Sequence, residues 1–264
     1  MVNENLVYVN IGCANIYKQP TFHCEVISQV VLWERLKFIK QSADFALIVA
    51  EDNYEGWIHQ NQIMHYESSR PTRNIAVTAP QVSFFRQASS VSGIIRDGVA
   101  GIRIPIIIEK DKWFKTNFPD GAEGWIETKN CGSVKILNRN ELINYACSFL
   151  GVSYIWGGKT PKGFDCSGFT QFVHKMFGIN LRRDAYMQYE DSTPVSKNPM
   201  DGQPGDLLFF SENNDRITHV GLCYKPGYVI HCQGMVKINS LNAEEKKYNE
   251  KLLKDFVEIR TFIY

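Results

Sequence analysis

The spacing of hydrophobic positions along the chain changes near Ile136. Before that point, short hydrophobic runs such as 45–49 and 104–108 alternate with turn residues, a pattern typical of β-strands. The sequence Glu55-Gly56-Trp57-Ile58 recurs as Glu123-Gly124-Trp125-Ile126. This repeat predicts two small β-barrels of roughly 60 to 70 residues each. The polar stretch 68–74 suits the connection between them.

After Ile136 the hydrophobic spacing becomes helical. A first helix is expected to begin at Asn140 as N-cap, to bury a face that includes Leu150, and to end at Gly151. A second helix is expected from Cys166 to Phe177. Strand-like runs follow at 206–210, 220–224, 228–231 and 256–262, and helices followed by strands predict an α+β domain. The predicted domains are therefore residues 1–70, 71–136 and 137–264.

Charge and composition exclude several classes of protein. The formal net charge is +1 without a basic block, so nucleic acid is not an expected partner. No run approaches 18 apolar residues and the N-terminus lacks a signal-peptide pattern, so we expect no membrane association. Seven cysteines cannot all pair, which favours a reducing compartment. We predict a cytoplasmic monomer without a cofactor, or a secreted or periplasmic protein if a leader has been removed.

Cys166 stands out among the cysteines because it lies where a loop turns into the second helix. The positive end of a helix dipole stabilises a thiolate, so this is a position for a nucleophile, although cysteine is also a common packing residue. His219 opens one strand and His231 ends the next, and antiparallel pairing would bring the imidazoles together. A cysteine nucleophile needs a base, and the base needs a group that fixes its tautomer.

A zinc site built from Cys166, His219 and His231 is the alternative for the same residues. The three lack the close paired spacing of structural zinc sites, so we assign no metal.

The motifs of the last domain carry a family resemblance. Tyr154-Ile155-Trp156-Gly157-Gly158, Phe164-Asp165-Cys166-Ser167-Gly168-Phe169, Thr218-His219-Val220-Gly221 and Ile230-His231 resemble, in order and spacing, the NlpC-type papain-like cell-wall cysteine peptidases. The resemblance spans residues 140 to 264. Two bacterial SH3-like domains ahead of a papain-like α+β catalytic domain also resemble the γ-D-glutamyl-L-diamino-acid endopeptidases of that family.

The resemblance implies a reaction and a set of roles. The Cys166 thiolate would attack the γ-amide between D-Glu and diaminopimelate or Lys in a peptidoglycan stem peptide. His219 would protonate the leaving amine and His231 would hold His219 in place. Tyr154, with the backbone N–H of Cys166, would stabilise the oxyanion. Trp156 is a further candidate for substrate binding. Without the resemblance, Tyr154 would be interpreted as an aromatic residue that packs beside Trp156.

The resemblance also implies residues that bind substrate. Asp184, and Glu25 from the first domain, would bind the free amine of an N-terminal L-Ala, with Tyr54 as an aromatic partner. Asp165 and Ser167 would line the pocket or cap the helix start. The motif around Asp184 departs from its usual form, with Arg182 for Pro and Ala185 for Ser, which leaves one polar contact open.

The leading prediction is therefore a peptidase that releases L-Ala-γ-D-Glu from peptidoglycan-derived peptides during cell-wall recycling. Two alternatives stay open. One is a wall-binding protein with an inert catalytic domain, against which intact Cys166, His219 and His231 argue. The other is a papain-like amidase or acyltransferase on a different substrate, because a nucleophile and a base alone do not name a substrate.

Overall fold

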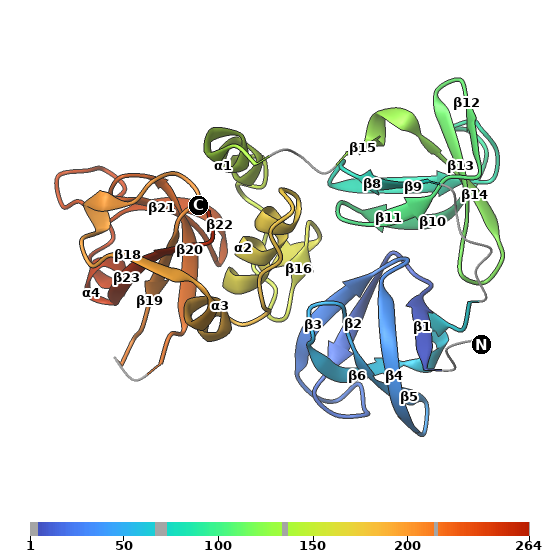
Figure 1. The fold of residues 1–264 in the computed structure, drawn as a ribbon, viewed down its shortest axis with the longest axis horizontal. Helices are drawn as coiled ribbons and strands as arrows, with labels where there is room; N and C mark the ends of the chain where they lie inside the picture. Colours follow the sequence, from blue (N-terminus) through green and yellow to red (C-terminus); the bar gives the residue numbers. More distant parts are fainter. Residues whose placement is uncertain (1–4, 67–72, 134–136, 214–215, 264) are drawn as a thin grey trace. The chain divides into compact units, whose positions relative to one another are not determined.

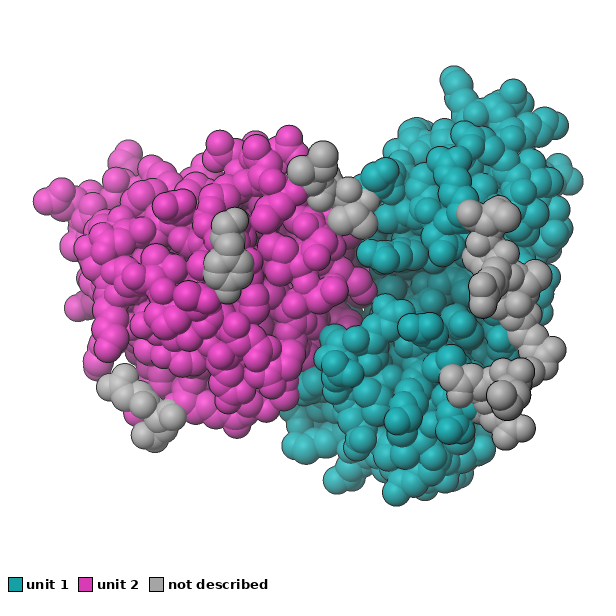
Figure 2. Space-filling model, in the orientation of Figure 1, with its two compact units in different colours: residues 1–134 teal, residues 135–264 magenta. Residues whose placement is uncertain are grey.

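The computed structural model describes residues 5–66, 73–133, 137–213 and 216–263 (Figure 1). It divides into two compact units, residues 1–134 and 135–264 (Figure 2). The predicted domain boundaries at 70 and 136 lie outside the described residues, so both stay predictions. Within the described ranges, no helix is long and apolar enough to cross a membrane.

The first unit begins with an antiparallel sheet in the strand order β3-β2-β6-β5-β4-β1-β7. Its hydrophobic core includes Val9, Ile16 and Ile48. The strand predicted at 45–49 is present as β5, with the predicted bounds. The strands are β1 (Leu6–Val9), β2 (Cys13–Tyr17), β3 (Val26–Val31), β4 (Arg35–Ser42), β5 (Phe45–Val49), β6 (Glu55–His59) and β7 (Ile63–Met64).

The remainder of the first unit holds two further antiparallel sheets, ordered β10-β9-β14-β13-β12 and β11-β8-β15. Their shared core also contains Val31 and Leu32 from the preceding sheet region. The strands are β8 (Asn74–Val77), β9 (Gln81–Phe85), β10 (Ile94–Val99), β11 (Arg103–Pro105), β12 (Ile108–Lys110), β13 (Trp113–Asn117), β14 (Glu123–Glu127) and β15 (Cys131–Gly132).

The predicted barrels are not confirmed as closed structures. In the described part of the first unit, each sheet ends in two edge strands, such as β3 and β7 in the seven-stranded sheet. The hydrophobic run at 104–108 is also not one strand, because it is divided between β11 and β12. Pro105 ends β11, as expected for a residue that cannot donate a backbone hydrogen bond.

The sequence repeat corresponds to a repeated structural element. Its first copy forms β6, followed by the 3₁₀ turn η1 (Gln60–Gln62) and the two-residue strand β7. Its second copy forms β14, followed by η2 (Thr128–Asn130) and β15. The two copies therefore share their local structure as well as their sequence.

The second unit combines short helices with an antiparallel sheet ordered β18-β23-β19-β20-β21-β22. Helix α2 packs against β20 and β21. The predicted α+β architecture of this unit is therefore present. Its elements are α1 (Arg139–Cys147), β16 (Lys159–Thr160), β17 (Gly163–Phe164), α2 (Cys166–Lys175), α3 (Ala185–Asp191), β18 (Thr193–Ser196), η3 (Pro199–Asp201), β19 (Leu207–Phe210), β20 (His219–Lys225), β21 (Tyr228–Gln233), β22 (Met235–Ser240), α4 (Glu250–Lys254) and β23 (Phe256–Thr261).

The first helix differs from the prediction at both ends. Asn138, and not Asn140, is the N-cap, because its side-chain oxygen accepts from the backbone N–H groups of Asn140 and Glu141 at 3.0 and 3.1 Å. The helix ends at Cys147, so Leu150 lies beyond it and is 47% exposed. Gly151 has the predicted left-handed conformation (φ 87°).

His174 on α2 gives the unit an acid-sensitive core. Its ring is fully buried, its Nδ1 lies 2.9 Å from the carbonyl oxygen of Thr170, and burial lowers its pKa from 6.5 to about 4. The unfolded chain therefore binds the proton more readily, and stability is lost as pH falls from about 6.5 toward 4. We expect this histidine to remove roughly 2 kcal/mol between pH 7 and 5.

His174→Gln tests this expectation, because an amide can still donate to Thr170 but does not titrate. Calorimetric stability measured at pH 7 and pH 5 should fall less for the variant than for the wild type. An identical fall in both proteins would show that other groups cause the acid sensitivity.

Candidate active site

Cys166 is the first residue of α2, and Asp165 is the helix N-cap. The Asp165 carboxylate accepts from the backbone N–H of Gly168 at 2.7 Å and from that of Gly157 at 3.0 Å. The first bond caps the helix, and the second attaches the Tyr154–Gly158 segment to it. Asp165 thus caps the start of α2, which was one of its two predicted roles.

A close backbone approach holds the same segment against the helix. A Cβ atom at Gly168 would lie only 2.1 Å from the carbonyl oxygen of Gly158. Tyr154 is fixed from two sides, by a bridge to Phe164 and by its backbone N–H, which donates to the carbonyl of Gly234 at 2.9 Å. The motif glycines are therefore needed to bring Tyr154 near the helix start.

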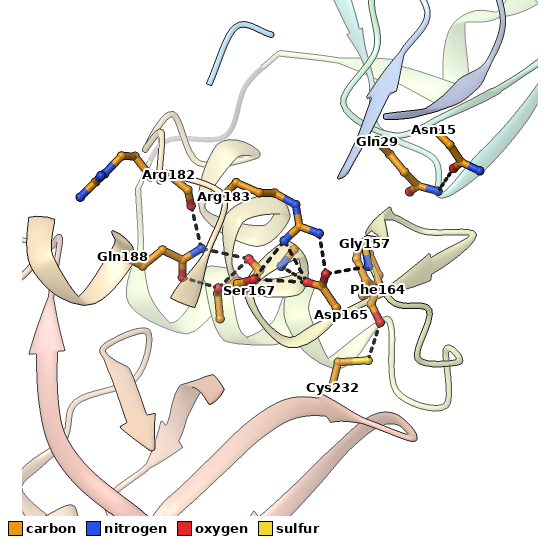
Figure 3. A network of polar contacts seen from close by, with 12 residues as sticks. Asn15, Gln29, Gly157, Phe164, Asp165, Ser167, Arg182, Arg183, Gln188 and Cys232 are labelled. Atoms are coloured by element: carbon orange, nitrogen blue, oxygen red, sulfur yellow. Dashed lines mark hydrogen bonds and ion pairs between the residues drawn. The ribbon is translucent and has the colours of Figure 1, made fainter. Parts of the chain in front are cut away.

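A buried ion pair lies directly behind Cys166. Arg183 is 1% exposed, and its guanidinium bonds both carboxylate oxygens of Asp165 and the hydroxyl of Ser167, the last at 3.0 Å (Figure 3). A bidentate arginine–carboxylate pair is geometrically specific. It connects the helix start to the segment that carries Asp184. The sequence analysis did not single out Arg183.

Two histidines form a hydrogen-bonded pair on the sheet. Nε2 of His219 lies 2.7 Å from Nδ1 of His231. Their strands, β20 and β21, pair in the predicted antiparallel direction, and this pairing brings the two rings together. His231 lies within β21 and not at its end. Its other nitrogen, Nε2, lies 3.0 Å from Oδ1 of Asn239 on β22, a residue that the sequence analysis missed.

The motif glycine Gly221 makes room for this pair. A Cβ atom there would lie 2.8 Å from Cβ of His231 and 2.5 Å from a methyl group of Val229. A larger residue at this position would therefore displace the strand that carries His231.

The thiol of Cys166 lies against the strand that begins with His219. The backbone of Val220, the next residue, makes a hydrogen bond to Cys166. The structure thus brings Cys166 to the first residues of β20, where His219 is located. Cys166 as a whole residue has intermediate exposure, while its thiol is buried.

The electrostatics of Cys166 differ from the prediction that the helix terminus alone stabilises a thiolate. Burial, followed by the negative charge of Asp165, raises the pKa of the thiol to about 12. Hydrogen bonds from Val220 and Ser167 and the charge of Arg183 oppose this rise but do not cancel it. The raised pKa favours the protonated thiol, so its reaction depends on a base.

The low pKa values of both histidines favour the neutral imidazole. Burial, followed by the charges of His231, Lys237 and Lys251, lowers the pKa of His219 to about 3. Burial also lowers the pKa of His231 to about 4. Imidazoles with low pKa values carry an unshared electron pair at neutral pH.

Tyr154 and Cys232 complete the surroundings of the thiol. Burial, with the nearby Cys166 and Asp165, raises the pKa of the Tyr154 phenol, so it remains protonated and able to donate a hydrogen bond. Cys232, beside His231, donates from Sγ to the carbonyl of Phe164 at 3.1 Å. Trp156 is 62% exposed and so presents most of its ring to solvent.

The predicted substrate residues fall in two groups. Asp184 is the N-cap residue of α3, but its side chain does not cap that helix. The neighbouring Ser167 is buried and bonded to Arg183. Glu25 and Tyr54 belong to the first unit, where Glu25 forms an exposed salt bridge with Lys18 at 3.0 Å. Their participation in the site stays a prediction.

The geometry of the histidine pair bears on the zinc alternative. Two zinc ligands each lie about 2.0–2.1 Å from the metal, which separates tetrahedral ligand nitrogens by more than 3 Å. The facing nitrogens of His219 and His231 are 2.7 Å apart, which is a hydrogen-bond distance. The two nitrogens therefore bind each other and do not converge on a metal ion.

Named relatives resemble this chain over different lengths. A γ-D-glutamyl-L-lysine dipeptidyl-peptidase of Bacillus cereus is 26% identical over 224 residues, covering 77% of this chain and 66% of that protein. The protein of the same name from Bacillus subtilis is 26% identical over 238 residues, covering 85% and 78%. A probable endopeptidase p60 of Listeria seeligeri is 44% identical over 92 residues. This chain spans just under two thirds of the first relative and 17% of the third.

A solved structure shares the fold. The crystal structure of an NlpC/P60 family protein from Bacillus cereus ATCC 10987 has a TM-score of 0.85 at 20% identity, covering 98% of this chain and all of that one. The sequence profile of the NlpC/P60 family matches residues 151–257, which include the nucleophile helix and both histidine strands. Residues 151–257 of this chain therefore form an NlpC/P60 domain.

Proposed function

We propose that this chain is a cysteine peptidase that hydrolyses the bond between γ-D-Glu and a diamino acid in peptidoglycan-derived peptides. The observation that carries the proposal is the hydrogen-bonded histidine pair at the strand against which the Cys166 thiol lies. The names of the two Bacillus relatives, which match more than three quarters of this chain, support the choice of bond.

In the first half of the reaction, His219 takes the proton from the Cys166 thiol. The sulfur attacks the γ-carbonyl carbon, and the carbonyl oxygen becomes negatively charged. The protonated Tyr154 phenol and the backbone N–H of Cys166 are the proposed donors to this oxygen. His219 then gives its proton to the leaving amine nitrogen, the C–N bond breaks, and a thioester to Cys166 remains.

In the second half, water attacks the thioester carbonyl while His219 accepts a proton from it. The C–S bond breaks and the sulfur recovers a proton, which releases the γ-carboxylate. The neutral His219 serves as base in both halves.

The first unit contributes recognition in this proposal. We assign its described sheets to two SH3-like modules, one for each copy of the repeated strand, 3₁₀ turn and short strand. The match of both Bacillus relatives beyond the NlpC/P60 domain supports a function shared by the whole chain. Glu25 and Tyr54 are the residues of the first module that we propose to face the substrate, together with Asp184.

We expect the enzyme to require a free N-terminal amine on its substrate. An ammonium group between Asp184 and Glu25 would form charge-assisted hydrogen bonds worth roughly 1.5–3 kcal/mol each. N-acetylation removes that charge, so kcat/KM should fall about tenfold to a hundredfold or more per contact. The measurement compares L-Ala-γ-D-Glu-diaminopimelate, its Lys analogue and the N-acetylated form of each.

Single variants separate the contributions of the two carboxylates. Asp184→Asn and Glu25→Gln should each lose activity on the free peptide and lose less on the acetylated one. Glu190→Gln, an exposed carboxylate in the same unit as Asp184, is the control and should match the wild type. Equal rates on free and acetylated peptides would contradict the requirement for the amine. A loss of activity confined to Asp184→Asn would show that Glu25 does not bind the substrate amine.

A further inference from the structure

We infer that Asn239 is a positioning residue that sets the proton positions in the histidine pair, so that His219 offers an unprotonated Nδ1 to the Cys166 thiol. Asn239 lies on β22, outside every motif of the family resemblance. The inference rests on the proposed function, because it assigns His219 the role of base.

The orientation of the Asn239 amide follows from its second contact. Its Nδ2 donates to the backbone carbonyl of Lys247 at 3.3 Å, and the same carbonyl accepts from the backbone N–H of Ser240 at 2.7 Å. Rotating the amide by 180° would place Oδ1 against that carbonyl oxygen, where two acceptors would repel each other. Oδ1 therefore faces His231.

The proton positions then follow along the chain of contacts. Oδ1 of Asn239 can only accept, so the hydrogen of neutral His231 is on Nε2, 3.0 Å away. Nδ1 of His231 consequently has no hydrogen and accepts from Nε2 of His219 at 2.7 Å. A neutral His219 with its hydrogen on Nε2 has a free electron pair on Nδ1. Nδ1 is the nitrogen that can take the thiol proton.

Strand register brings Asn239 to this place. His231 lies directly opposite Lys237 on β22, and Asn239 is two residues further along, on the same face of the sheet. Such diagonal neighbours are within reach of long side chains. The contact depends on the β21–β22 register and not on the spacing of any motif.

The amide is also suited to the charge that develops during the reaction. When Nδ1 of His219 takes the thiol proton, Nε2–H of His219 still donates to His231. Because the Asn239 amide is not a base, it cannot take a proton from either histidine. The charged and titratable groups around the pair are Lys237 and Lys251, which lower the pKa of His219. On the helix side, Asp165, Arg183 and Tyr154 are the charged and titratable groups near the Cys166 thiol.

Two substitutions separate positioning from simple packing. Asn239→Leu removes the acceptor, and we expect kcat to fall about 10- to 100-fold with little change in KM, the range found for residues that orient a metal-bound histidine. Asn239→Asp keeps an acceptor and adds a negative charge, which raises the pKa values of nearby groups. It should retain most of the kcat at its optimum, and both limbs of its pH–rate profile should move to higher pH.

Asn242→Leu is the matched control. Asn242 lies three positions further along, and its Oδ1 accepts from the backbone N–H of Glu244 at 3.1 Å, away from the histidines. Its kcat and pH profile should match the wild type. Equal losses in Asn239→Leu and Asn239→Asp, with no movement of the limbs, would show that Asn239 only supports the strand.

A readout without substrate keeps this test separate from the proposed function. In the full-length protein labelled with ¹⁵N-histidine, both His219 and His231 should carry their hydrogen on Nε2, and Asn239→Leu should give a mixture of tautomers at His231. Wild-type tautomers together with wild-type kcat in Asn239→Leu would overturn the inference. If no γ-glutamyl peptide is cleaved by the wild type, the proposed function fails, and the tautomers still decide the role of Asn239.

Discussion

Cys166→Ala is expected to reduce kcat by a factor on the order of 10⁶, the loss found when the nucleophile of a catalytic triad is removed. The expected loss is large because no other described cysteine is placed to substitute: Cys232 donates to the Phe164 carbonyl and is fully buried. The fold should persist, since Cys166 is the first residue of α2 and the substitution removes a single sulfur atom from a residue of intermediate exposure. The measurement is hydrolysis of L-Ala-γ-D-Glu-diaminopimelate by purified variant and wild type.

Cys147→Ala is the matched control for this substitution. Cys147 is also a half-buried free cysteine near a helix end in the second unit. Its activity should equal that of the wild type. A Cys166→Ala variant that has wild-type stability and keeps a tenth of the wild-type activity would show that Cys166 is not the nucleophile.

Arg183→Met is expected to destabilise the second unit by roughly 3–5 kcal/mol, the cost of leaving a buried charge without its partner. The Asp165 carboxylate would keep its bonds from Gly157 and Gly168 but lose the guanidinium that neutralises it. Because Asp165 caps α2, the helix start that carries Cys166 should become less ordered, and activity should fall with stability.

The adjacent Arg182 provides a sharp comparison. Its side chain is 38% exposed and pairs with Glu190 and Asp191 at the surface, so Arg182→Met should cost less than about 1 kcal/mol. Urea unfolding can be followed by hydrogen exchange of the α2 amides, which excludes signals from the first unit. Equal destabilisation by the two substitutions would contradict a special role for the buried pair.

Local sequence patterns were sufficient for the elements that carry the nucleophile and the histidines. The change to helical spacing predicted α2 with Cys166 at its start, and antiparallel pairing of two successive strands predicted that His219 and His231 meet. Both predictions depend only on short stretches of chain. A helix start and a hairpin are determined locally, so the sequence reveals them.

Features that depend on tertiary structure were not predicted. The register between β21 and β22 brings Asn239 to His231, and no motif spacing encodes that register. The burial of Arg183 against Asp165 joins residues that are separated by a whole helix. The sequence did not show that burial of the Cys166 thiol raises its pKa against the hydrogen bonds at the helix terminus. The barrel topology, the amine pocket and the cytoplasmic location stay predictions.

The central claim is that the chain hydrolyses a γ-D-glutamyl amide through a thioester on Cys166. The most direct test is mass spectrometry of the products formed from L-Ala-γ-D-Glu-diaminopimelate and its Lys analogue in water enriched with ¹⁸O. We expect L-Ala-γ-D-Glu carrying one ¹⁸O atom in its γ-carboxylate, together with the free diamino acid, and neither product with Cys166→Ala. Intact peptide after prolonged incubation, or a D-Glu residue transferred to another amine, would contradict the claim and favour the wall-binding or the acyltransferase alternative.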